Sequence, residues 1–182
     1  MSLEIVLGPM FSGKSSYALS YIRRQKAIGR NVLAVKPSID RRYSEDDEII
    51  THNKDKTPCI VWDPSAPITP NRFMRQADCI VIEEAQFFTG LSTFCGYMVQ
   101  LGKNVVLVGL DGDARRQPFR EILDCIPWAN KVTKLSALCK YCKDGSDAPY
   151  TVYRESSNQS GSQVDVGGPE KYEAVCLRHL TR

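Results

Sequence analysis

The sequence predicts an α/β fold, with helices flanking a parallel β-sheet and a small second module at the C-terminal end. The first part follows from short apolar runs that alternate with segments of helical pattern up to about residue 138. The second follows from a change of composition, because cysteine, serine, glycine and aspartate become frequent from Leu138 onward. We therefore expect two domains, residues 1–138 and 139–182.

The apolar runs and helical patterns give the expected order of elements. The first strand is predicted over residues 3–7, and the first helix over residues 14–28, with Gly29 as a suitable C-terminal stop. The polar stretch 37–57 is predicted to be a loop. Further strands are expected over residues 31–36, 59–62, 79–82 and 104–109, and further helices over residues 71–76, 91–101 and 118–125.

A phosphate-binding motif lies between the first strand and the first helix. Its pattern, G-x-x-x-x-G-K-S, is that of the P-loop, and a chance glycine-rich turn is the alternative. Backbone N–H groups and the helix dipole would face phosphate oxygens, Lys14 would neutralise the outer phosphates, and Ser15 would bind Mg²⁺. This indicates a P-loop NTPase-like sheet. The predicted phosphate-binding residues are Gly8, Pro9, Met10, Phe11, Ser12, Gly13, Lys14 and Ser15.

Two adjacent carboxylates, Glu83 and Glu84, follow the apolar strand 79–82. Ligands of open α/β sheets bind beyond the carboxyl ends of the strands. One carboxylate there would hold Mg²⁺, and the other could accept a proton from a hydroxyl that attacks the γ-phosphate. Neighbouring residues on a strand face opposite sides, so only one can face the site squarely unless the strand has already ended. A solvated pair at a strand end is the alternative.

Two metal-binding knuckles mark the C-terminal module. Cys139-x-x-Cys142 and Cys176-x-x-His179 are separated by 33 residues. Two knuckles that each offer two ligands are typical of a structural Zn²⁺ site with four protein ligands. A redox dithiol would explain neither Cys176 nor His179, and unpaired buried cysteines are a further alternative. The remaining cysteines are expected to be small core residues: Cys59, Cys79, Cys95 and Cys125.

Composition argues against several classes of partner. The net charge of +3, from 24 basic and 21 acidic residues, is too balanced for a duplex nucleic-acid binder. No apolar run approaches the roughly 18 residues of a membrane span, and the N-terminal run is too short for a signal peptide. Seven widely spread cysteines do not resemble a secreted disulfide framework. We expect a cytoplasmic protein that binds neither nucleic acid nor membranes.

The order of the motifs resembles the cellular and poxviral type of thymidine kinase. The matching segments, which span nearly the whole chain, are residues 8–15, 82–88, 110–119, 132–142 and 166–179. The resemblance implies transfer of the γ-phosphate of ATP, with Mg²⁺, to the 5′-hydroxyl of thymidine or deoxyuridine, giving dTMP for pyrimidine salvage and DNA synthesis. It also implies a structural Zn²⁺, feedback inhibition by dTTP, and assembly as a homotetramer or homodimer.

The resemblance assigns roles to individual residues. Glu84 matches the general base, and Glu83 matches the magnesium-associated acid, which is usually Asp. On the phosphate side, Asp40, Arg42 and Gln86 match further residues, although Arg42 by itself is equally well a solvated loop arginine. The implied nucleoside-binding residues are Met10, Phe87, Leu110, Ala114, Phe119, Thr151, Val164, Asp165, Val166, Gly167 and Tyr172, several of them in a lasso between Cys142 and Cys176.

Two departures from the family pattern affect this pocket. Ala114 stands where the family usually has Phe or Tyr, so either the wall is thinner or another aromatic fills it. Arg154 follows Thr151 with one more residue between them than in the family. The alternative function is a P-loop ATPase without a nucleoside acceptor. A zinc-ribbon nucleic-acid module is disfavoured, because no basic face with interleaved aromatics is present.

Overall fold

A six-stranded, entirely parallel sheet forms the centre of the molecule, with strand order β5-β2-β6-β7-β1-β8. The computed structural model describes residues 1–39, 48–50, 56–154 and 161–180. Asp40 and Arg42 lie outside the described residues. The strands of the sheet are β1 (Ser2–Leu7), β2 (Val32–Pro37), β5 (Ile60–Trp62), β6 (Cys79–Ile82), β7 (Asn104–Gly109) and β8 (Lys131–Lys134).

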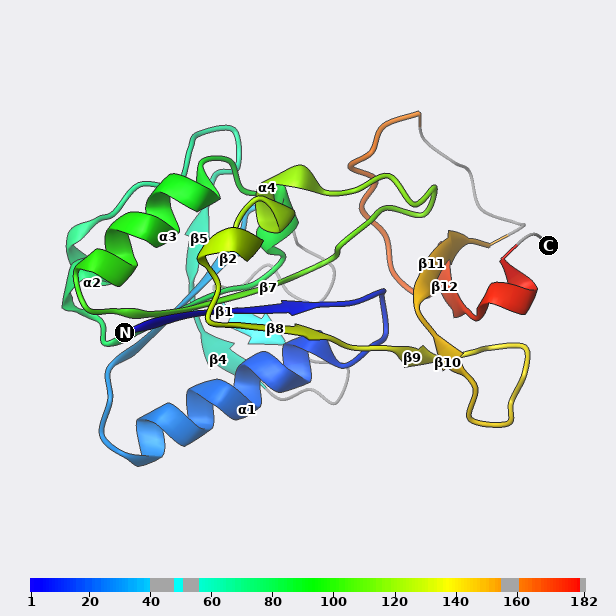
Figure 1. The fold of residues 1–182 in the computed structure, drawn as a ribbon, viewed down its shortest axis with the longest axis horizontal. Helices are drawn as coiled ribbons and strands as arrows, with labels where there is room; N and C mark the ends of the chain where they lie inside the picture. The colour runs from blue at the N-terminus through cyan, green and yellow to red at the C-terminus, as the bar shows by residue number, and fades with distance from the viewer. Residues whose placement is uncertain (40–47, 51–55, 155–160, 181–182) are drawn as a thin grey trace.

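Helices cover both faces of this sheet (Figure 1). Helix α1 (Lys14–Ala27) packs on one face, where Ala18 and Ile22 meet Val106. Helices α2 (Arg72–Gln76), α3 (Leu91–Gln100) and α4 (Arg120–Leu123) lie over the other face, against a larger core. Successive strand residues point to opposite faces, and β6 and the residues of β7 after Asn104 are apolar and buried on both sides, whereas β1 carries Ser2 and Glu4 in its first half.

The predicted fold class and its main elements are confirmed, and the differences lie at the periphery. The edge strand β8 was not predicted, because its sequence, Lys-Val-Thr-Lys, has no apolar run and is mostly exposed. Two short strands, β3 (Glu48–Ile50) and β4 (Lys56–Pro58), pair within the stretch predicted to be a loop, so that prediction is wrong there. Helix α4 is shorter than predicted and begins after Pro118.

The C-terminal part lies beyond the carboxyl ends of the central strands (Figure 1). Strand β9 (Ala137–Leu138) pairs with β10 (Asp147–Ala148), and β11 (Tyr150–Tyr153) pairs with β12 (Tyr172–Val175), both antiparallel. A small separate core joins the two pairs. The division into two domains at residue 138 stays a prediction. The remaining elements are three short 3₁₀ turns, η1 (Ala85–Phe87), η2 (Ile126–Trp128) and η3 (Leu177–His179).

No helix in the described part of the chain has both the length and the apolar character needed to cross a membrane.

Two glycines in the fold give opposite predictions for stability. Gly96 lies inside α3, and a Cβ added there would meet the Trp128 ring at an ordinary 3.8 Å. Gly96→Ala should therefore raise the free energy of unfolding by about 0.5–1 kcal/mol, the usual helical preference for alanine. Gly109→Ala should lower it by about 1–3 kcal/mol through overpacking, because the Cβ would lie 2.4 Å from Gln86 Oε1.

Urea unfolding of both variants beside the wild type checks this pair. Equal changes of the same sign in the free energy of unfolding would contradict the difference in packing between Gly96 and Gly109.

Candidate functional site

Residues 8–15, which carry the P-loop motif and are named the P-loop here, curl tightly between β1 and α1. Gly8 and Gly13 both have positive φ angles, 153° and 82°, and a Cβ at Gly8 would lie 2.6 Å from the carbonyl oxygen of Leu135. Lys14 is 9 % exposed, and its ammonium donates to the carbonyl oxygen of Pro9 at 2.6 Å. Helix α1 begins at Lys14, and Ser15 is half-buried in its first turn. The loop therefore presents a helix N-terminus and a buried ammonium at one place.

Parallel pairing brings three segments to the same edge of the sheet. Strands β6, β7 and β1 are consecutive neighbours, so their carboxyl ends lead side by side into Glu83, Leu110 and the P-loop. The backbone N–H of Glu83 donates to Val35 at 2.9 Å, which continues the sheet for one residue beyond β6. This is the edge at which open α/β sheets bind their ligands.

The carboxylates of Glu83 and Glu84 have different environments. Strand β6 ends at Ile82, so strict alternation no longer applies to the pair. Glu83 is only 4 % exposed. Glu84 adopts left-handed φ and ψ angles of 48° and 44°, is half-buried, and lines a pocket. A left-handed non-glycine residue costs roughly 1–3 kcal/mol, so the surrounding structure holds this conformation.

Gln86 fixes the orientation of the Glu84 carboxylate. Its amide nitrogen donates to Glu84 Oε2 at 2.6 Å, and its amide oxygen accepts from the backbone N–H of Leu110 at 3.0 Å. Gly109 is required beside it, since any side chain there would meet the amide oxygen. Gln86 was predicted on the phosphate side; the structure places it as a link between Glu84 and the end of β7.

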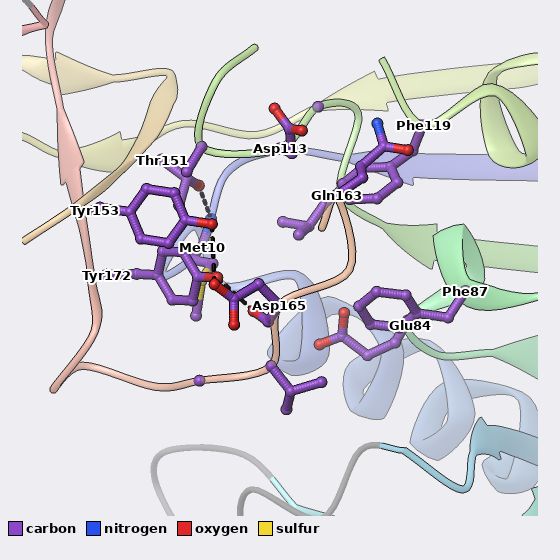
Figure 2. A pocket seen from close by; sticks show the side chains of 15 residues that line it. Met10, Glu84, Phe87, Asp113, Phe119, Thr151, Tyr153, Gln163, Asp165 and Tyr172 are labelled. Carbon is purple, nitrogen blue, oxygen red and sulfur yellow. Dashed lines mark hydrogen bonds between the residues drawn. The ribbon is translucent and has the colours of Figure 1, made fainter. Parts of the chain in front are cut away.

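The pocket beside Glu84 holds about 530 Å³, part of it open to solvent. Figure 2 shows Glu84 and Phe87 entering from the sheet side, and Thr151, Tyr153 and Tyr172 entering from the C-terminal part. The rings of Phe87 and Phe119 meet edge to face at 6.2 Å. The predicted residues that line it are Met10, Glu84, Phe87, Leu110, Ala114, Phe119, Thr151, Asp165, Val166, Gly167 and Tyr172.

Val164 alone among the predicted nucleoside-binding residues does not line this pocket, and it is 44 % exposed. Four lining residues were not predicted: Gly112, Asp113, Tyr153 and Gln163.

Strand alternation is the signal that could have found Tyr153. In β11, Thr151 and Tyr153 are two residues apart and so point to the same side, which is the pocket. Arg154 does not line the pocket, and its guanidinium donates to the carbonyl oxygen of Pro169 at 2.9 Å. Asp113 is held in the pocket wall by a turn, in which its carboxylate accepts from the N–H groups of Arg115 and Gln117, both at 2.8 Å.

Thr151 ties the C-terminal part directly to the P-loop. The backbone N–H of Met10 donates to Thr151 Oγ1 at 2.9 Å in a buried hydrogen bond, and Thr151 is 6 % exposed. A hydroxyl from β11 thus satisfies a backbone donor in the middle of the P-loop. Met10 itself lines the pocket, so the loop also forms part of its wall.

The four predicted zinc ligands come together in space. The ligand atoms of Cys139, Cys142, Cys176 and His179 all lie within 4.8 Å of one another. His179 Nδ1 is 3.3–3.5 Å from the three sulfur atoms, and the sulfur atoms of Cys142 and Cys176 are 3.6 Å apart. Tetrahedral Zn²⁺, with bonds of about 2.3 Å to sulfur and 2.0 Å to nitrogen, separates its ligand atoms by about 3.4–3.8 Å.

The chemistry of this donor set also fits zinc. Burial opposes ionisation of Cys139, but backbone hydrogen bonds from Cys176, Cys142 and Tyr141 outweigh it and lower the pKa of the thiol to about 6. Zinc binds the thiolate form. Three sulfurs and one nitrogen would complete a tetrahedron and leave no position for a reactive water.

Zinc removal should destabilise the C-terminal part of the chain. Purified protein should contain stoichiometric zinc, and Cys142→Ser should lower both the zinc content and the melting temperature, because the small core there depends on the cluster. Metal analysis and thermal unfolding measure these quantities. Cys59→Ala, which changes a cysteine outside the cluster, should keep its zinc; a zinc-free wild type would overturn the assignment.

Loss of the Thr151 hydroxyl should destabilise the P-loop. Thr151→Val leaves the buried N–H of Met10 without its acceptor, which costs about 1–3 kcal/mol. Thr151→Ser keeps the oxygen and should retain most of the wild-type stability. Urea unfolding compares the two, and equal free energies of unfolding would contradict a role for this hydrogen bond.

Comparison of the sequence with known proteins identifies its family. The family model for thymidine kinase matches residues 1–180. A thymidine kinase of Yaba monkey tumor virus is 37 % identical over 96 % of this chain and 91 % of its own length. Thymidine kinase a of Arabidopsis thaliana is 38 % identical over 98 % of this chain and 74 % of its own length. A thymidine kinase of rabbit fibroma virus is 34 % identical over 97 % of this chain and 94 % of its own length. The chain belongs to the thymidine kinase family.

Proposed function

We propose that this protein transfers the γ-phosphate of ATP to the 5′-hydroxyl of thymidine, and of deoxyuridine, and so produces dTMP for DNA synthesis from salvaged nucleosides. One observation carries the proposal: a single pocket is bounded by Met10 of the P-loop, by the Glu84 carboxylate and by the C-terminal part of the chain. Donor phosphates at the P-loop and an acceptor in this pocket would therefore be neighbours. Membership of the thymidine kinase family supports the same reaction.

The donor side is assigned to the P-loop. Its N–H groups and the start of α1 would hold the phosphates of ATP, and the buried Lys14 would neutralise their charge. Ser15 and Glu83 would hold Mg²⁺, which prefers such oxygen ligands and would neutralise charge on the transferred phosphoryl group. By resemblance, Asp40 and Arg42 would assist on this side.

Glu84 is assigned as the general base. Its carboxylate lines the acceptor pocket and is oriented by the amide of Gln86, so it can take the proton of a bound 5′-hydroxyl. The apolar walls formed by Phe87, Leu110 and Phe119 suit a pyrimidine ring. Residues 161–169 of the lasso would exclude water around the reacting groups.

Several further assignments belong to this proposal. The Zn²⁺ would be structural and would fix the ends of the lasso. Inhibition by dTTP, a homotetrameric or homodimeric assembly and a cytoplasmic setting follow from the resemblance to the cellular and poxviral enzymes.

Substitution of the base tests the reaction. Glu84→Gln keeps the shape of the side chain but removes its basicity, so kcat for thymidine should fall about 10²–10⁴-fold without unfolding. Lys14→Ala should abolish transfer. Monophosphate formation from thymidine and from deoxyuridine, with ATP and Mg²⁺, is the assay.

Glu4→Gln is the matched control. Glu4 lies in β1, where its carboxylate pairs with Lys131, and it does not line the pocket. This variant should keep wild-type turnover. Near-complete activity of Glu84→Gln would refute the base assignment, whereas ATP hydrolysis without any nucleoside phosphorylation would favour the P-loop ATPase alternative.

A further inference from the structure

Tyr153 is an aromatic residue of the pocket that neither the motif nor the family resemblance assigns. It projects from β11 on the same side as Thr151 and lines the acceptor pocket. Across the β11–β12 ladder it lies directly opposite Tyr172. Figure 2 shows the two rings together on the wall that faces Glu84 and Phe87.

The ring of Tyr153 is held on two sides. Its centroid lies 5.1 Å from that of Tyr172, with the planes tilted by 31°. Its hydroxyl donates to Asp165 Oδ2 at 3.0 Å. Such cross-strand aromatic pairs stabilise a sheet, and a hydrogen bond at the far end of the ring leaves it one preferred orientation.

Asp165 is itself held by two further residues of the lasso, Lys171 and Tyr172. Its side chain is 9 % exposed, and its carboxylate pairs with the Lys171 ammonium. Its backbone oxygen accepts from the Tyr172 hydroxyl. Asp165 thus connects both tyrosines with Lys171. The ring of Tyr153 is therefore already in place before a ligand arrives, and its position costs little on binding.

The segment after β7 contributes two small residues, Gly112 and Ala114, to the pocket wall, beside Leu110, Asp113 and Phe119. At the two small residues, bulk is supplied only by other segments. Tyr153 and Tyr172 supply two rings from the paired strands β11 and β12. Removal of one ring would enlarge the pocket by the volume of a phenol group without touching Glu84 or the P-loop.

We propose that Tyr153 is a specificity-determining residue of the acceptor site, which restricts the pocket to pyrimidine deoxynucleosides with small ring substituents, and that Asp165 positions it. This inference rests on the proposed function. It predicts that Tyr153 acts on the choice among acceptors and not on the chemical step.

A panel of acceptors tests the proposal. The values of kcat/KM are measured with ATP for thymidine and for deoxyuridines that carry propyl or bulkier groups at C5 or at N3. The size ratio is defined as kcat/KM for a bulky acceptor divided by kcat/KM for thymidine, and it is measured in two series, one substituted at C5 and one at N3. In Tyr153→Ala the size ratio should rise about tenfold or more in at least one series, because a few carbon atoms in such a pocket discriminate by this factor. Tyr153→Leu should shift the ratio in the same direction.

Tyr153→Phe separates the ring from its hydroxyl. It keeps the bulk, so the size ratio should stay within about threefold of wild type, while KM for thymidine rises because Asp165 no longer orients the ring. Tyr97→Ala, which removes an exposed ring on α3, is the matched control and should leave both quantities unchanged.

The failures of the two proposals are distinguishable. If the wild type phosphorylates thymidine but folded Tyr153→Ala and Tyr153→Leu keep the wild-type size ratio in both series, the assignment of Tyr153 is wrong. If the wild type phosphorylates no nucleoside, the proposed function is wrong, and the inference fails with it.

Discussion

Parallel pairing of β6, β7 and β1 is the constraint on which the rest of the site depends. In this arrangement Ile82, Leu107 and Ile5 lie in register across three neighbouring strands. The segments that follow the three strands therefore all begin at the carboxyl-terminal side of the sheet. The carboxyl-terminal halves of these three strands are apolar and buried on both faces. Polar groups follow directly where the strands end, which concentrates the P-loop and the two glutamates at one place, where the proposed nucleotide would bind.

The C-terminal part of the chain is hydrogen-bonded to the segments that follow the central strands. The Thr151 hydroxyl oxygen accepts a hydrogen bond from the backbone N–H of Met10, and the Gln163 amide donates to the carbonyl oxygen of Pro118 at 3.2 Å. These contacts fasten β11 and the lasso to segments that follow β1 and β7. A small core and a compact Cys₃His cluster hold the two ends of this part together. The pocket therefore depends on an element that could not form a large core by itself.

Two of the four left-handed non-glycine residues in the described part of the chain lie at the proposed site. Glu84 and Phe11 both have left-handed φ angles, 48° and 65°, in a region that favours glycine. At Glu84 the Gln86 amide, anchored on the Leu110 N–H, bonds the carboxylate and so opposes relaxation. If Glu84 is the base that we propose, a carboxylate held in this way would need no rearrangement before it accepts a proton, which is the advantage of preorganisation.

The sequence by itself determined the α/β class, the P-loop motif, the acidic strand end and the two pairs of residues that form the Cys₃His cluster, because each depends on a local pattern of residues. Only the tertiary structure decided that Tyr153 faces the pocket while Arg154 does not, and that Gln86 bridges Glu84 and Leu110. It also revealed β8, an edge strand whose exposed residues need no apolar run. These features arise from contacts between segments far apart in the chain, so no local pattern of residues encodes them.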